Sequence, residues 1–232
     1  MSSVTAPKTS RSNRGSKSSN LKSRSTSVYS VHPGVAMTQK WVGELREKTG
    51  RSLEEWIRLV RKEGPPSEQA RREWLKDQHG LGTNSAWWIA GRVQGKGSED
   101  DDPEEYLRSA ERHVEAMFAG AKAAMRPIYD KLLALGLGIG PDAKACPCQT
   151  IVPLYRNHVF AQIKPTTRTR IDLGFALGPL MKEKKKIPAR LLDTGGFAKK
   201  DRITHRIPIT AIKDIDDEVK RMLRTAYELD NK

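Results

Sequence analysis

Cysteine is scarce in this sequence, because the 232 residues contain only Cys146 and Cys148. Two cysteines separated by one residue cannot build a disulfide framework, so we expect a reducing, cytoplasmic location. Long hydrophobic runs are also missing: no stretch approaches the roughly 18 apolar residues that cross a bilayer, and no signal-peptide core follows Met1. We therefore expect neither secretion nor a membrane partner.

Acidic residues are absent from the first 40 positions, which contain seven lysines and arginines. Residues 144–212 are similarly unbalanced, with fourteen basic and four acidic residues, and the whole chain has a formal charge of +14. A charge of this size favours a polyanionic partner, above all nucleic acid. A basic protein with no polyanionic partner is the alternative.

Composition divides the chain into four parts. Residues 1–36 are rich in Ser, Thr, Lys and Arg and too poor in apolar residues to fold, so they predict a disordered basic tail. An organelle transit segment, or a true start at Met37, are alternatives for this part. A helical domain is expected over 37–93, a Gly-rich and acidic linker over 94–102, and a second domain over 103–232.

Capping patterns predict four short helices in residues 37–93. The first ends at Gly50, and Ser52 with Glu55 forms a capping box for the second. Ser67 caps the third, and the fourth begins near Thr83. All five tryptophans lie here and are expected in the small core, with Trp88 the least certain to be inside.

The second domain changes from helical to alternating periodicity. Pro103 starts a helix that Pro127 kinks or divides, and Asp214 caps a final helix. The strands are expected at Ile151–Tyr155, Asn157–Lys164, Arg170–Leu177, Ile187–Leu192 and Ile203–Ile209. The fold class is therefore α+β, with a mainly antiparallel sheet flanked by helices.

Strand alternation predicts that one sheet face is cationic. The residues assigned to this face or to its loops as anion ligands are Arg156, His158, Lys164, Arg168, Arg170, Lys199, Lys200, Arg202 and Arg206. Phe160 falls on the same face, where it would stack on a base. An ordinary solvated sheet face is the alternative.

The turn Gly80-Leu81-Gly82, followed by Ala86 and Ile89, resembles the helix-hairpin-helix pattern of nucleic-acid proteins. In that family the glycines let backbone N–H groups reach a phosphate oxygen, independently of base sequence. The resemblance adds Thr83 and Asn84 as side-chain donors. The alternative is that these residues form only the end of one helix and the N-terminal cap of the next.

Two longer stretches carry a family resemblance. "KTGRSLEEWIRLVRKEG" and "WLKDQHGLGTNSAWWIA" resemble a small helical bacterial domain, the domain of unknown function 4287. "TIVPLYRNHVFAQIKPTTRTRIDLGFALG", "RLLDTGGFAKKDRITHRIPI" and "VKRMLRTAYEL" resemble the domain of unknown function 5655, which follows it in the same proteins and is loosely similar in layout to iron-chaperone-like proteins. The resemblance implies a fold and a bacterial cytosolic setting, but no catalytic residue.

Signals for enzymes and cofactors are weak. Asp172 followed by Glu183-Lys184-Lys185 has the order of a Mg²⁺-dependent nuclease site, although the second element lies in a predicted loop. The two cysteines lack the further ligands that a zinc site needs, and Gly195-Gly196 fits a hairpin loop better than a phosphate loop. We therefore expect no metal and no cofactor.

The leading hypothesis is a non-enzymatic protein that binds nucleic-acid phosphates, of DNA or RNA, through the sheet face and the glycine turn. The alternative is a pocket for a small anionic ligand, formed by Arg156, His158, Arg170 and Thr204. A nuclease is the third possibility. Nothing in the sequence indicates the oligomeric state.

Overall fold

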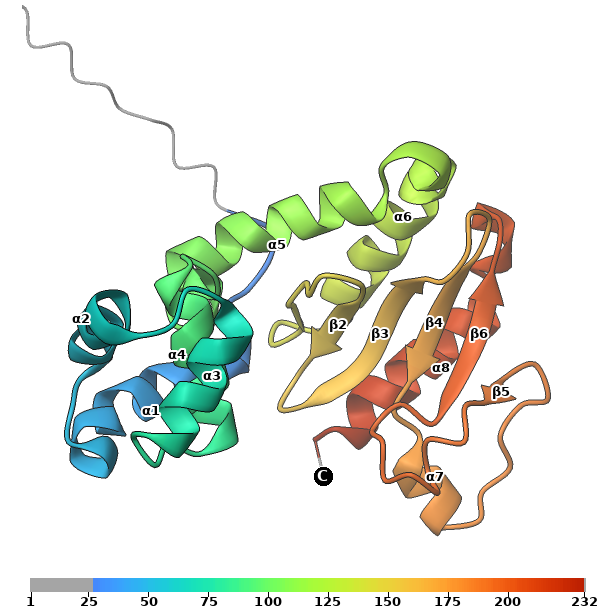
Figure 1. Cartoon of the computed structure of the whole chain (residues 1–232). Helices are drawn as coiled ribbons and strands as arrows, with labels where there is room; N and C mark the ends of the chain where they lie inside the picture. The colour runs from blue at the N-terminus through green and yellow to red at the C-terminus, as the bar shows by residue number, and fades with distance from the viewer. Residues whose placement is uncertain (1–26, 232) are drawn as a thin grey trace, which may run out of the picture.

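A computed structural model describes residues 27–231, so the predicted tail lies largely outside the described residues. The described chain forms a helical region followed by a sheet with helices on one face, joined by the long helix α5 (Figure 1). The predicted α+β class is confirmed.

The helical domain contains α1 (Pro33–Thr49), α2 (Leu53–Glu63), α3 (Glu68–Asp77) and α4 (Thr83–Val93). The capping box is present, because the Ser52 side chain accepts from the N–H of Glu55 and the Glu55 carboxylate accepts from the N–H of Ser52. Ser67 caps α3 in the same way. Gly50 ends α1 in the left-handed conformation that glycine adopts without strain.

The small core of this domain forms around Trp56, with Leu45, Leu75 and Ile89. Trp56 is buried, whereas the other tryptophans lie at the margin of the core or outside it. Trp87 has 56% of its surface exposed, so it is this residue, and not Trp88, that lies most clearly outside the core.

The chain before α1 differs from the prediction. Helix α1 begins at Pro33, so residues 33–36 are helical and do not belong to a disordered tail. Residues 27–32 run against the second domain: the Tyr29 hydroxyl is 2.9 Å from that of Tyr129, and the N–H of Ser30 donates to the carbonyl of Ala145. These contacts fix the segment that leads into the helical domain.

The linker region is also ordered. A short helix, η1 (Ser98–Asp100), lies within the predicted linker and contacts both α1 and α5 (Pro103–Met117). The next elements are η2 (Gly120–Met125) and α6 (Arg126–Leu137). The break therefore falls at Phe118, before Pro127, which occupies the first turn of α6, where its missing N–H costs no hydrogen bond.

The strands form one antiparallel six-stranded sheet in the order β1-β2-β3-β4-β6-β5. Their bounds are β1 Lys144–Ala145, β2 Val152–Tyr155, β3 Val159–Pro165, β4 Ile171–Phe175, β5 Leu192–Asp193 and β6 His205–Ile209. Most of the predicted strand at 187–192 is absent, because only Leu192 pairs with β6. The register places Asp172 opposite both Lys164 and Pro208.

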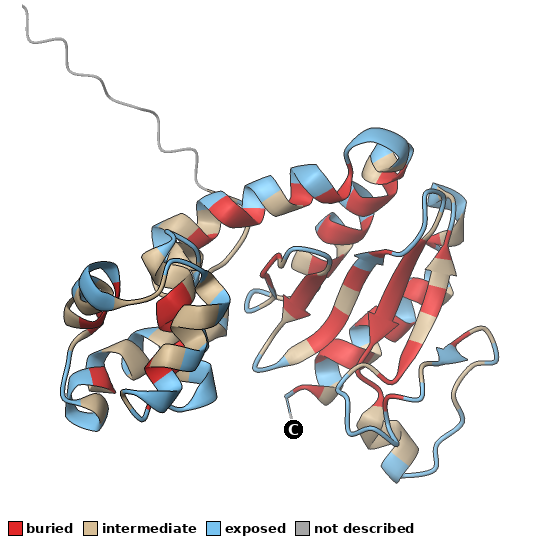
Figure 2. Cartoon of the chain, in the orientation of Figure 1, coloured by how far each residue is buried: buried red, intermediate tan, exposed pale blue. Residues whose placement is uncertain are grey.

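Three further helical segments complete the domain: α7 (Gly178–Lys182), η3 (Ile212–Asp214) and α8 (Asp217–Leu229). The cap of α8 is Asp216 and not Asp214, because the Asp214 carboxylate accepts from Thr210 and Ala211 one turn earlier. Helices α6 and α8 cover one face of the sheet, and the main core lies between them and the strands (Figures 1 and 2).

The prediction that Phe160 lies on the open face is wrong. Phe160 is fully buried and contacts Tyr227 of α8 with perpendicular rings. A register shift causes this, since Tyr155 pairs with Val159 while Leu154 pairs with Ala161. The extra residue in β3 is a bulge, which turns Phe160 toward the helices.

Replacing Phe160 with alanine should therefore lower the free energy of unfolding by about 3–5 kcal/mol, because it leaves a cavity beneath α8. Lys164→Ala, on the exposed side of the same strand, should change it by less than about 0.5 kcal/mol. Urea denaturation of both variants measures the two effects. Equal effects would contradict this assignment of the faces.

Candidate anion-binding groove

A groove of about 700 Å³ lies on the sheet face that α6 and α8 leave uncovered. The polar residues that line it are Tyr155, Gln162, Lys164, Thr166, Arg170, Asp172, Asp201, Arg202 and Arg206. All five residues of β4 are buried, including Gly174 on this open face. Ile203 and Gln162 lie directly over Gly174, so the face is a partly covered groove and not a flat solvated surface.

Asp172 is the centre of the charged network in this groove. It is 8% exposed, and its Oδ1 lies 2.8 Å from Nη1 of Arg206 and 3.1 Å from Nε of Arg170. The Thr166 hydroxyl donates to Oδ2 at 2.7 Å. Two guanidinium groups therefore share one carboxylate, and this end of the groove keeps a positive charge.

Lys164 adds to this charge. Its partner in the register is Asp172, and it forms no ion pair with any residue in 27–231. The Asp172 end of the groove thus has three cations for one carboxylate, while Asp201 lies in the segment that leads into β6. Because the guanidinium groups are only about one-third exposed, solvent screens them less than it screens surface charges.

The Tyr155 hydroxyl gives the groove a neutral hydrogen-bond donor. Nδ1 of His32 accepts from the N–H of Gly34, and Nε2 of His32 lies 2.9 Å from the Tyr155 oxygen. Burial lowers the pKa of His32, so its imidazole is neutral at pH 7 and must carry its proton on Nε2. Nε2 then donates to Tyr155, and the Tyr155 O–H remains free to donate into the groove.

Three predicted ligands contact carboxylates other than Asp172. Arg156 forms an ion pair with Asp142 at 2.8 Å and lies over the ring of Tyr227. His158 and Arg202 both pair with the buried carboxylate of Asp230. The cations therefore do not form one continuous free wall.

The histidine and threonine of β6 are core residues. His205 is buried, as its alternation with the isoleucines predicts, and it hydrogen-bonds to the Thr204 hydroxyl. Thr204 also accepts from the N–H of Leu177. Thr204 is consequently enclosed and cannot line an anion pocket.

The loop cations Arg168, Lys199 and Lys200 are exposed and form no ion pair with described residues. Arg168 lies in the β3–β4 turn, whereas Lys199 and Lys200 lie in the loop between β5 and β6. Because β4 pairs with β6 in antiparallel register, these two loops lie at opposite ends of the strands. The unpaired loop cations therefore lie at both ends of the groove.

Part of the glycine turn forms the C-terminal cap of α3. The N–H of Gly80 donates to Lys76 and that of Leu81 donates to Leu75, which is the hydrogen-bond pattern of a helix C-terminus. No side chain of residues 27–231 caps α4, and Gly82 has open space beside it. Phosphate contacts at this turn would therefore come from Gly82, Thr83 and Asn84, and not from Gly80.

The nuclease elements are separated. Asp172 lines the sheet groove, while Glu183 lines a second cavity beside His158 and Lys200. No group of three His, Cys, Asp or Glu side chains within residues 27–231 is arranged as metal ligands are. The Asp172 carboxylate instead contacts Arg170, Arg206 and the Thr166 hydroxyl, so its role is to hold the two arginines in place.

His32, Tyr155 and Thr166 complete the groove but were not predicted as site residues. Tyr155 follows the same alternation as the predicted polar face, so the pattern contained a signal for it. His32 has no such signal, because it lies in a segment whose composition predicts disorder. Its position follows from tertiary contacts alone.

Two family models match the chain. Residues 38–94 match the domain of unknown function DUF4287, and residues 114–230 match the domain of unknown function DUF5655. The second match covers half of the chain, which therefore belongs to the DUF5655 family. Neither the curated proteins nor the solved structures give a match. Among the described helices, none has the length and apolar character needed to cross a bilayer.

Acidification should destabilise the protein through His32. Its folded-state pKa lies below the usual value of 6.5, so below about pH 6.5 the unfolded chain binds a proton that the folded chain rejects. The free energy of unfolding should then decrease as the pH falls from 7.5 to 5.5, and burial of His205 contributes in the same direction.

Urea denaturation across this pH range measures the effect. His32→Asn keeps an acceptor for the N–H of Gly34 but does not titrate, so its pH dependence should be shallower than that of the wild type. A curve as steep as the wild-type curve would contradict this role of His32.

Proposed function

We propose that the sheet groove binds a small ligand with a phosphate or carboxylate group, and that the protein is a non-enzymatic binding protein of the cytoplasm. The observation that carries this proposal is the sharing of one carboxylate, Asp172, by Arg170 and Arg206. The two arginines and the one carboxylate together have a net positive charge, and they lie inside a concave site.

The donors of the groove suit an anion. A guanidinium group has five N–H donors, so Arg170 and Arg206 retain donors after they have contacted Asp172. Lys164 adds a mobile ammonium group, and the free Tyr155 O–H adds a neutral donor at the other side of the groove. Hydrogen bonds between charged groups and an oxyanion are stronger than neutral ones, particularly where water is partly excluded.

Two observations favour a small ligand over a polymer. The groove is concave, and its volume of about 700 Å³ is within the range of small-molecule sites. The outer cations Arg156 and Arg202 are paired with acids, so a long polyanion would find few free charges across the face.

Nucleic acid is the second candidate, and the unpaired loop cations favour it. Arg168 at one end of the strands and Lys199 and Lys200 at the other would contact phosphates on either side of the groove. The basic residues of the first 26 positions would add to this charge, although they lie outside the described residues. Such binding would be independent of base sequence.

The small-ligand proposal is tested by titrating the protein with inorganic pyrophosphate in a calorimeter. Arg206→Ala should weaken binding about tenfold or more, because a charged hydrogen bond is worth roughly 1.5–3 kcal/mol. Asp172→Asn should strengthen it, because the neutral amide no longer competes for the arginines. Arg108→Ala, an exposed arginine on α5, is the matched control and should bind as the wild type does. Unchanged affinity in Arg206→Ala would exclude the groove as the site.

Nucleic-acid binding is tested by titrating labelled duplex and single-stranded DNA and RNA at several salt concentrations. For duplex DNA, log K should fall with log salt by about 0.9 for each phosphate contacted. Replacing Arg168, Lys199 and Lys200 together with alanine should reduce that slope, and deletion of residues 1–26 measures the share of the N-terminal segment. Absence of binding at low salt would remove this candidate.

A further inference from the structure

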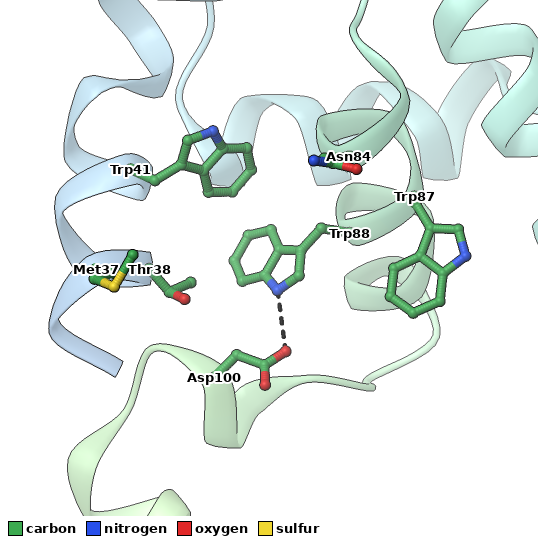
Figure 3. A pocket seen from close by; sticks show the side chains of 7 residues that line it. All are labelled: Met37, Thr38, Trp41, Asn84, Trp87, Trp88 and Asp100. Carbon is green, nitrogen blue, oxygen red and sulfur yellow. Dashed lines mark hydrogen bonds between the residues drawn. The ribbon is translucent and has the colours of Figure 1, made fainter. Parts of the chain in front are cut away.

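The helical domain contains a cavity of its own, here called the tryptophan pocket. It has a volume of about 400 Å³ and lies between α1, α4 and η1 (Figure 3). The residues that line it are Met37, Thr38, Trp41, Asn84, Trp87, Trp88 and Asp100. None of them belongs to the sheet groove.

The apolar surface of this pocket is unusually open. Met37 is 73% exposed and Trp87 is 56% exposed, although both are large apolar side chains that a small domain would normally bury. They flank the inner pair, Trp41 and Trp88, in Figure 3. Exposed methionine and tryptophan side chains grouped at a cavity are typical of a binding site.

The inner tryptophans form an aromatic corner. The rings of Trp41 and Trp88 are nearly perpendicular, with centroids 5.0 Å apart. The guanidinium group of Arg92 already lies over the Trp88 ring, 5.2 Å from its centroid. Indole rings attract positive groups through their π electrons, and the Trp88 ring already does so with Arg92.

Asp100 gives the pocket a negative charge. Its Oδ2 accepts a hydrogen bond from Nε1 of Trp88 at 3.2 Å, as Figure 3 shows. No cationic side chain within residues 27–231 forms an ion pair with Asp100, whereas the neighbouring Asp101 pairs with Arg92. The carboxylate disfavours an anionic ligand, and a purely apolar ligand would bury it without compensation.

We propose that the tryptophan pocket binds a methylated ammonium group. Two perpendicular indole rings, a thioether and one uncompensated carboxylate match a cation that is bulky, weakly hydrated and covered with methyl groups. A quaternary ammonium group has no N–H donors to satisfy, so the few acceptors of the pocket suffice. This site is independent of the sheet groove, and either can fail without the other.

Choline and its neutral isostere 3,3-dimethylbutan-1-ol test the proposal on the wild-type protein. The two molecules have nearly the same shape and differ in charge, so choline should bind about tenfold more tightly if the cation is recognised. Calorimetry measures both affinities at constant ionic strength. Equal affinities, or no binding of choline, would overturn the proposal.

The indole N–H resonances of the five tryptophans locate the binding. Choline should shift the Trp88 signal most, because this N–H contacts Asp100, and Trp88→Phe identifies the signal by its disappearance. A shift confined to the tryptophans outside the pocket would also overturn the proposal.

Asp100→Asn removes the charge and keeps the shape, and it should weaken choline binding about tenfold without affecting the neutral isostere. Asp77→Asn, an exposed aspartate at the end of α3, is the matched control and should bind as the wild type does. Unchanged choline affinity in Asp100→Asn would contradict the assigned role of the carboxylate.

A peptide with one trimethyllysine, compared with the same peptide carrying unmodified lysine, separates two sources of the group. Tighter binding of the methylated peptide than of choline would identify a modified side chain as the ligand. The reverse order would identify a free small molecule. Given that choline binds, either order supports the methylated ammonium chemistry.

Discussion

The buried carboxylate of Asp172 is the constraint on which the open side of the sheet depends. A carboxylate at this depth is unfavourable unless cations and hydroxyl groups satisfy it. Thr166 and Arg170 of the β3–β4 turn and Arg206 of β6 do so, and they hold this turn and β6 against the middle strand. The same contacts leave an excess of positive charge.

The second constraint is the segment that precedes α1. Tyr29 reaches Tyr129 on α6, Ser30 pairs with the edge of β1, and His32 both caps α1 and hydrogen-bonds to Tyr155 of β2. One short stretch therefore contacts both domains. The imidazole ring of His32 therefore has two roles. It caps α1, and it leaves the Tyr155 O–H free to donate into the groove.

Local rules predicted much of the fold. The caps at Ser52 and Ser67 and the helix start at Pro103 depend on neighbours within a few residues, so the sequence alone was sufficient. The alternation that placed Lys164 and Arg206 on one face was also correct. The bulge at Phe160 was not predictable, because it follows from how β2 and β3 pair.

The free charge of the open sheet face was predicted less well than the strands that form it. Counting basic residues could not reveal that Arg156 contacts Asp142, or that His158 and Arg202 contact Asp230. These partners lie about 14 to 72 positions apart along the chain, so no local pattern indicates them. Long-range pairing also recruited His32 to the groove. Charge totals describe the field of a protein, whereas individual contacts decide which charges remain available.

The margins of the sheet affect how the protein meets other copies of itself. Strand β5 has two residues, β6 contains Pro208, which lacks an N–H, and Ser30 occupies part of the opposite margin at β1. Such blunted margins offer little template for an incoming strand. Growth of the sheet from one molecule into the next is therefore disfavoured.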